Sequence, residues 1–174
     1  MPVIGRIGKK MRATLLRLRF GRGFSQAAQE RAVRAAIEAA GLDCVRGLQL
    51  LDAVLGDTRG RPFDFGRDSV HWLVFACLAD SLPAVSRILE IGTYDGQFTA
   101  ILARLFPAAA ITTVDLPETD PILRSTYQRD ADAAYRRFVA TRDANLAAPN
   151  IRFRQFNSAF LLDHVAGPFD LVWG

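Results

Sequence analysis

The sequence predicts an α/β fold in which helices cover a parallel sheet, with a helical extension in front of it. The main observation is a change of pattern after Pro83, where short apolar segments begin to alternate with helical ones. The second is composition, because half of the 174 residues are hydrophobic, which argues against disorder. We divide the chain into a basic arm over 1–24, a helical extension or lid over 25–82 and an incomplete α/β core over 83–174.

The N-terminal arm carries an excess of positive charge. Seven Lys and Arg residues precede the first acid, Glu30, whereas the net charge of the whole chain is +4. The rest of the chain is therefore slightly acidic, and the basic total does not indicate a nucleic-acid-binding domain. We interpret the arm as a solvated tail, and the alternative is a surface helix that touches anionic lipid or RNA. No apolar run is typical of a bilayer span or a secretory signal, so we expect a cytoplasmic protein.

Three helices are expected in the extension. Ser25 can cap the first helix and Gly41 can end it. Cys44 and Cys77 lack CxxC spacing and are interpreted as buried, reduced thiols, and with two histidines in the chain no metal site is expected. The helices are expected over 25–40, over 44–54 and from 68 or 69 to 82, with a turn-rich loop over 56–66.

The core is expected to contain four strands that alternate with three helices. The strands are short and apolar, and the segments between them have helical composition and periodicity. This β-α-β-α-β-α-β order predicts a parallel sheet with helices on both faces and right-handed crossovers. The expected strands are 87–91, 111–115, 151–156 and 169–173, and the expected helices are 97–106, 130–146 and 159–165.

The turn after the first expected strand is the candidate binding loop, because ligands of such sheets bind at the carboxyl ends of the strands. It reads Glu90-Ile-Gly-Thr-Tyr-Asp-Gly96. Gly92 lets the backbone approach a ligand, and Gly96 permits a tight entry into a helix whose N-terminus offers free N–H groups. Asp115 ends the second strand, where its carboxylate is placed to accept both hydroxyls of an adenosine ribose.

The spacing and charge of this loop discriminate between adenosine ligands. A dinucleotide fingerprint requires GxGxxG, whereas the glycines here are spaced GxxxG. Carboxylates such as Glu90 and Asp95 would repel a pyrophosphate and attract a cation, and Asp115 disfavours a 2′-phosphate. S-adenosylmethionine carries a sulfonium and an ammonium group, so it suits the loop better than NAD or NADP.

The same residues resemble the class I methyltransferases, which have a Rossmann-like fold. The segment 87–96 is similar to their first motif, and 113–116 is similar to their second, acidic motif. The segment 169–173 resembles their fourth strand, and the similarity covers about residues 68 to 174. The resemblance implies a strand order of 3-2-1-4 and S-adenosylmethionine as cofactor.

The resemblance also implies roles for individual residues. Glu90 would help to hold the methionine amino group, and Asp115 would bind the ribose. Asn157 and Ser158, after the third strand, become candidates for the adenine edge. The full set of expected cofactor-binding residues is Glu90, Gly92, Thr93, Tyr94, Asp95, Gly96, Asp115, Leu116, Asn157 and Ser158.

Each of these assignments has a plainer alternative. Glu90 could pair with Arg87 or Arg104, and Asp115 and the glycines could be ordinary turn residues. Residues 157–158 could cap a helix, a role that is compatible with a cofactor contact.

The chain ends at Gly174, directly after the fourth expected strand. A full sheet of the family has seven strands, so strands five to seven are expected to be missing and the fourth would form an open apolar edge. We favour a longer natural protein or a truncated gene product, and the alternative is completion by another chain, including a second copy.

No residue is a convincing catalytic base. Asp64 and His71 precede the first strand, where such folds often build a lid, and His71 is otherwise interpreted as structural.

We therefore predict an S-adenosylmethionine-dependent methyltransferase whose unidentified acceptor is a small molecule. The alternative is a non-catalytic or truncated module that binds S-adenosylmethionine or adenosine. The GxxxG spacing disfavours an NAD-linked dehydrogenase. A nucleic-acid acceptor is disfavoured because few aromatic side chains interleave with the basic residues of the arm.

Overall fold

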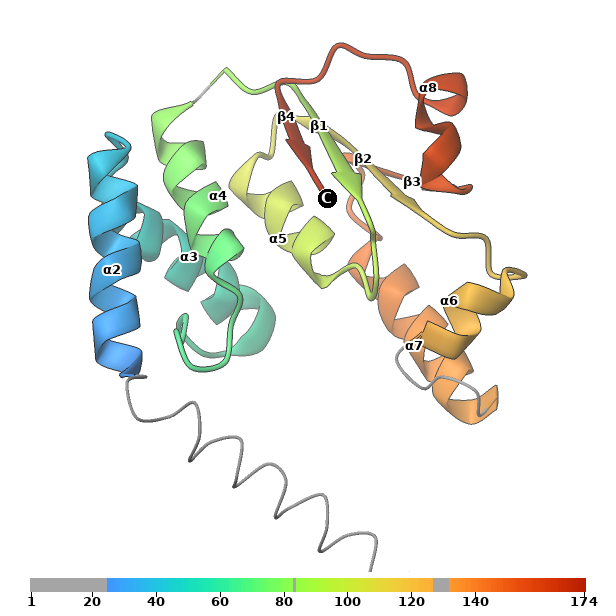
Figure 1. Cartoon of the computed structure of the whole chain (residues 1–174), viewed down its shortest axis with the longest axis horizontal. Coiled ribbons are helices and arrows are strands. Elements are labelled where there is room, and N and C mark those ends of the chain that lie inside the picture. The colour runs from blue at the N-terminus through green and yellow to red at the C-terminus, as the bar shows by residue number, and fades with distance from the viewer. Residues whose placement is uncertain (1–24, 83, 127–131) are drawn as a thin grey trace, which may run out of the picture.

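The computed structural model describes residues 25–82, 84–126 and 132–174 and shows a four-stranded sheet flanked by helices (Figure 1). The expected arm over 1–24 lies outside the described residues. In chain order the elements are α2 (Gln26–Ala39), α3 (Cys44–Arg59), α4 (Val70–Ser81), β1 (Arg87–Ile91), α5 (Gln97–Leu105), β2 (Ala110–Asp115), α6 (Pro121–Ser125), α7 (Asp132–Asn145), β3 (Ile151–Gln155), the 3₁₀ turn η2 (Ser158–Phe160), α8 (Leu161–His164) and β4 (Leu171–Trp173).

The strands form one parallel sheet in the order β3-β2-β1-β4, as the sequence predicts. Ile88 of β1 lies opposite Ile111 of β2 and Leu171 of β4. Ile88 and Leu89 point to opposite faces of the sheet and both are buried, so both faces of β1 are covered. Figure 1 shows α4 and α5 on one side of the strands and α8 on the other. The chain therefore has a Rossmann-like α/β fold.

Asp170 fixes the start of β4 to the start of β1. Its Oδ2 accepts hydrogen bonds from the backbone N–H groups of Ser86 (2.8 Å) and Arg87 (2.9 Å) and from the Ser86 hydroxyl (2.9 Å). These hydrogen bonds hold the pKa of Asp170 below its usual range. The resulting register places Trp173 opposite Glu90 at the carboxyl end of the two strands.

Helices α3 and α4 pack closely on each other and on α5. A Cβ added at Gly47 of α3 would lie 2.2 Å from Cys77 Sγ of α4, so the two helices approach each other most closely where α3 lacks a side chain. Cys44 and Cys77 are buried, as predicted, and burial raises the pKa of the Cys77 thiol to about 11. Across the described ranges, no helix combines the length and the apolar character that a bilayer span requires.

Several predicted boundaries need correction. Helix α3 continues to Arg59, so the first part of the loop expected over 56–66 is helical, and Gly60 ends the helix in the left-handed region at φ 65°. Helix α6 was not expected, and it begins with Pro121 after an Asp120 cap that accepts from the Ile122 N–H. The single helix expected over 159–165 is a 3₁₀ turn, η2, followed by α8.

Candidate functional site

Two cavities lie at the carboxyl ends of the strands, on either side of Gly92. The sheet-side cavity has a volume of about 120 Å³ and is lined by Ile91, Gly92, Val114, Asp115, Leu116, Phe156 and Ser158. The helix-side cavity has a volume of about 300 Å³ and is lined by Ser69, His71, Trp72, Glu90, Gly92, Thr93, Tyr94, Asp95, Gln97, Phe98 and Trp173. Eight of the ten predicted cofactor residues line one cavity or the other.

Gly92 belongs to both cavities and needs the freedom of glycine. Its φ is 97°, a backbone conformation that L side chains rarely adopt, and its N–H donates to the Val114 carbonyl at 2.8 Å. A Cβ added there would meet no atom within 4 Å. The backbone is therefore open to a ligand at the point where the two cavities meet.

Glu90 is a carboxylate buried at the wall of the helix-side cavity. Its side chain accepts hydrogen bonds at Oε2 from the hydroxyls of Thr99 (2.5 Å) and Thr113 (2.6 Å), and the residue is 2% exposed. Burial raises the pKa of Glu90 to about 7, although the two hydroxyl donors oppose that shift. Thr113 is in turn within 2.7 Å of the Thr93 hydroxyl. Thr99 of α5 and Thr113 of β2 thus hold the carboxylate directly, and Thr93, in the loop after β1, contacts Thr113.

The expected alternative partners of Glu90 are engaged elsewhere. Arg87 donates to the Ala166 carbonyl at 2.7 Å, and Arg104 donates to the Ala100 carbonyl of its own helix at 3.2 Å. Within the described ranges no cationic side chain forms an ion pair with Glu90. The carboxylate is therefore buried without a compensating positive charge from that part of the chain.

Asp115 is held by the backbone at the mouth of the sheet-side cavity. Its Oδ2 accepts from the Tyr94 N–H at 2.8 Å, and its Oδ1 accepts from its neighbour Leu116 N–H at 2.8 Å. Each carboxylate oxygen retains a further lone pair for a ligand hydroxyl. The hydrogen bond to Tyr94 also ties the end of β2 to the loop after β1.

The loop between β1 and α5 contains a strained residue. Tyr94 has φ 52°, in the left-handed region that side chains other than glycine seldom occupy, and it is 46% exposed. Asp95 stabilises the next turn, since its Oδ1 accepts from the Gln97 N–H at 3.1 Å. Asn145 of α7 donates to the Asp95 carbonyl at 2.8 Å, so α7 supports the loop from outside.

Two predicted residues line neither cavity. Gly96 has φ 73°, and a Cβ there would lie 3.1 Å from the Arg142 carbonyl, from Asn145 Cβ and from Leu146 Cδ2. It is thus a close-packing position between the loop and the end of α7. Asn157 accepts from the Ala159 N–H at 2.9 Å, which is the helix-cap role that the sequence left open.

Part of the wall of the helix-side cavity was not predicted from the sequence. Trp72 and Trp173 line the helix-side cavity but were not predicted to do so, and His71 was interpreted as structural. The His71 ring stacks on Trp173, with centroids 4.8 Å apart and 26° between planes, and meets the Phe98 edge at 4.4 Å. Trp173 had one usable signal, because it ends a strand that pairs with β1.

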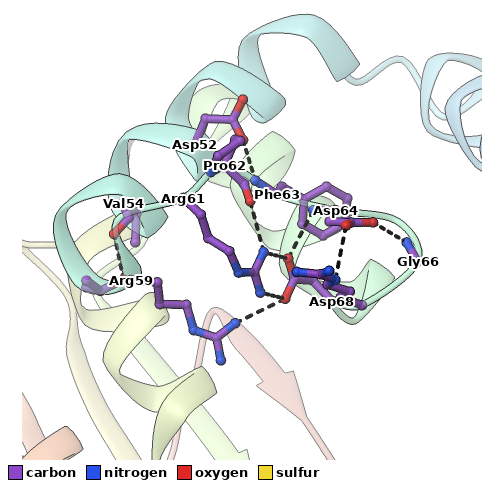
Figure 2. Close-up of polar contacts among 11 residues, drawn as sticks. Asp52, Val54, Arg59, Arg61, Pro62, Phe63, Asp64, Gly66 and Asp68 are labelled. Atoms are coloured by element: carbon purple, nitrogen blue, oxygen red, sulfur yellow. Dashed lines mark hydrogen bonds and ion pairs between the residues drawn. The ribbon is translucent and has the colours of Figure 1, made fainter.

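The loop before α4 is anchored by Asp68 (Figure 2). Its carboxylate, with 2% of the side chain exposed, accepts from Arg61 at 2.6 and 2.7 Å and from Arg59 at 3.0 Å. The Asp64 N–H donates to the same carboxylate at 3.0 Å. The Arg59 guanidinium also lies 4.9 Å from the Trp72 ring centroid. This cluster positions the first turn of α4 against the helix-side cavity.

A further cavity of about 510 Å³ lies away from the strand ends, between α3, α5 and the end of α7. Its wall includes Asp57, Arg59 and Arg104 together with several alanines. It shares Gln97 with the helix-side cavity, and none of its other lining residues belongs to either cavity around Gly92.

No family model matches the chain, and no curated protein matches it. Among solved structures, the chain is similar to the SAH-bound methyltransferase PaMTH1 from Podospora anserina, with a TM-score of 0.43 and 19% sequence identity. The similarity covers 86% of this chain and 57% of that one, so this chain spans less than two thirds of that protein's length.

Proposed function

We propose that this chain binds S-adenosylmethionine around Gly92 and transfers its methyl group to a small-molecule acceptor. The observation that carries the proposal is Glu90, a buried carboxylate that faces a cavity and has no ion-pair partner among the described residues. An unpaired buried carboxylate is costly, and the ammonium group of a ligand would offset that cost.

The remaining geometry fits the two halves of this cofactor. The methionine half would occupy the helix-side cavity, where Glu90 meets its ammonium group. The adenosine half would occupy the sheet-side cavity, where the free lone pairs of Asp115 would accept the ribose hydroxyls. Gly92 would let the chain of the cofactor pass between the cavities, since no Cβ obstructs that point. Ser158, at the sheet-side cavity, is the better placed of the two adenine-edge candidates.

The bound cofactor supplies an electrophilic methyl group. The residues of the chain bind and orient the reactants, which is the main catalytic requirement of a methyl transfer. Phe98 and Trp173 line the helix-side cavity with ring centroids 6.1 Å apart, and we expect these rings to limit the access of water to that side. The alternative function is a module that binds S-adenosylmethionine or adenosine without turnover.

Isothermal titration of the full chain with S-adenosylmethionine, S-adenosylhomocysteine and NAD tests the proposal. We expect the first two ligands to bind with similar affinity and NAD to bind much more weakly. Absence of binding by both sulfur-containing ligands would overturn the proposed function. Binding without transfer of a labelled methyl group to any of a broad set of acceptors would favour the module.

The Asp115→Ala variant locates the site. Losing a charge-assisted hydrogen bond worth about 1.5–3 kcal/mol should weaken binding of both ligands by roughly ten- to a hundredfold for each ribose hydroxyl that Asp115 binds. The matched control is Asp163→Ala, which removes an exposed carboxylate of α8 outside both cavities. Unchanged affinity in Asp115→Ala, with unchanged unfolding behaviour, would show that the ligand binds elsewhere.

A further inference from the structure

The first turn of α4 forms one wall of the helix-side cavity. Ser69, His71 and Trp72 contribute to it, and they lie opposite Glu90 and Asp95 from β1 and its following loop. The proposed cofactor contacts use none of the three α4 residues. This wall is therefore free to face the second reactant.

His71 is held there in a fixed orientation. Its Nδ1 lies 2.6 Å from the Ser69 hydroxyl, and its ring is fixed by Trp173 on one face and by Phe98 at 4.4 Å. In the described part of the chain no carboxylate forms a hydrogen bond or ion pair with the imidazole. With Nδ1 engaged by Ser69, Nε2 is the nitrogen that remains for a ligand.

The surroundings keep this imidazole neutral. Burial lowers the pKa of His71 below the ordinary value of a histidine, so the ring is uncharged at neutral pH. The charged groups on the same cavity are Glu90 and Asp95, and the Arg59 guanidinium stacks on the neighbouring Trp72. A neutral imidazole with an unused nitrogen is suited to accept a proton.

We infer that His71 is a catalytic residue, the general base that accepts a proton at Nε2 from a hydroxyl acceptor bound in the helix-side cavity. This inference rests on the proposed function. The acceptor oxygen forms a bond to the methyl carbon as the carbon–sulfur bond breaks and its electron pair goes to sulfur. The hydroxyl proton passes to His71 and then to solvent, so charge and atoms balance.

The chemistry of the wall favours a hydroxyl acceptor. A neutral hydroxyl is a weak nucleophile that gains from a positioned base, typically by 10²–10⁴-fold. The aromatic lining from Trp72, Phe98 and Trp173 favours an acceptor whose hydroxyl is attached to an apolar, planar body. Phenol is the simplest probe with both features.

The tautomer of His71 tests the inference without turnover. In a His164→Asn background His71 is the only histidine, so its two ring nitrogens can be assigned by ¹⁵N NMR. We expect a proton on Nδ1, a lone pair on Nε2 and no charge at pH 7. A proton on Nε2, or a charged ring at pH 7, would overturn the inference.

Methylation of phenol by the full chain, with labelled S-adenosylmethionine, provides the second test. We expect His71→Asn to lower kcat by at least about a hundredfold and to remove the acidic limb of the pH–rate profile. The affinity for S-adenosylhomocysteine should change less than threefold. The matched control is His164→Asn, because that ring contacts Phe156 and not the helix-side cavity.

The outcomes separate this inference from the proposed function. The role of His71 alone is contradicted if the chain binds S-adenosylhomocysteine but does not methylate phenol. It is also contradicted if His71→Asn leaves kcat unchanged. A chain that binds neither sulfur-containing ligand sinks the proposed function as well.

Discussion

Glu90 is an ionisable residue at a buried position where the charged form is unfavourable, and its surroundings set its pKa. Within the described part of the chain, the hydroxyls of Thr99 and Thr113 donate to the carboxylate and partly offset the cost of its burial. The pKa of Glu90 is then about 7. A residue chosen for stability alone would be apolar at this buried strand position. The carboxylate therefore destabilises the free protein at a point where a cationic ligand would reverse the effect.

The raised pKa of Glu90 makes the stability of the protein depend on pH. The folded state holds a proton on Glu90 between the ordinary carboxyl pKa of 4.5 and about 7, so the free energy of unfolding falls as the pH rises through that range. The loss attributable to Glu90 is up to about 3 kcal/mol. Urea unfolding at pH 5 and pH 8 should show this loss in the wild type and a smaller one in Glu90→Gln. Parallel pH profiles would mean that the carboxyl is not desolvated.

Gly96 shows how one position couples two elements. Its left-handed backbone starts α5, and its missing side chain lets α7 come within contact distance of the loop. The same backbone conformation occurs at Gly41, where φ is 78° and an added Cβ would meet no atom within 4 Å. The two glycines therefore separate backbone strain from close packing.

We predict that Gly96→Ala destabilises the protein more than Gly41→Ala does. Both substitutions should lose about 1–2 kcal/mol from the left-handed backbone. Gly96→Ala should lose a further 1 kcal/mol or so, because the added Cβ crowds the end of α7. Urea unfolding of the two variants measures the difference. Equal losses of stability in the two variants would show that α7 moves to accommodate the added Cβ without a loss of free energy.

The Asp68 cluster acts on the scale of a helix and its connecting loop (Figure 2). A nearly buried carboxylate receives both guanidinium groups, and the hydrogen bond from Arg61 is the main reason that the pKa of Asp68 lies below its usual range. The contribution to stability is thus present at neutral pH and is lost only as the pH falls through that lowered pKa.

Asp68→Ala should reduce the free energy of unfolding by about 2–3 kcal/mol, because it leaves two partly buried arginines without their partner. The matched control is Glu30→Ala, whose half-exposed i,i+4 ion pair with Arg34 should contribute less than about 1 kcal/mol. Tryptophan fluorescence is a suitable probe, since Trp72 and Trp173 are the two tryptophans of the chain and both line the helix-side cavity. A loss no larger than that of Glu30→Ala would show that the loop is held by other contacts.

The elements differ in how well the sequence predicts them. Strand β1 and the start of α5 follow from a short, mainly apolar segment and a turn with two glycines, and both were located correctly. Helix α6 was not predicted because it is only five residues long and has no apolar periodicity. The end of α3 was placed too early because Gly56 looks like a breaker, whereas packing on α4 and α5 carries the helix to Gly60.

On the scale of the whole molecule, some residues around the two cavities could be predicted from local sequence patterns and others could not. Glu90, Gly92 and Asp115 were predictable because strand ends and turns have local signatures, and the topology brings them together. His71 was named from the sequence only for its place before the first strand. Its packing against Trp173 was not predictable, because α4 is apolar on all sides and the contact joins residues about a hundred positions apart. Local pattern therefore indicates the residues of the proposed cofactor contacts, while tertiary packing determines the opposite wall of the helix-side cavity.

Ligand binding to the whole protein should depend on the protonation state of a single residue, Glu90. An ammonium group needs Glu90 ionised, so binding of S-adenosylhomocysteine to the free protein should displace the proton that Glu90 holds below pH 7. Affinity should rise about tenfold between pH 6 and pH 8, with proton release detected by calorimetry in buffers of different ionisation enthalpy. Glu90→Gln should bind more weakly at pH 8 and show no such rise. His71→Asn should retain it, which distinguishes Glu90 from the imidazole on the same cavity. An affinity independent of pH in the wild type would mean that Glu90 does not meet the ligand charge.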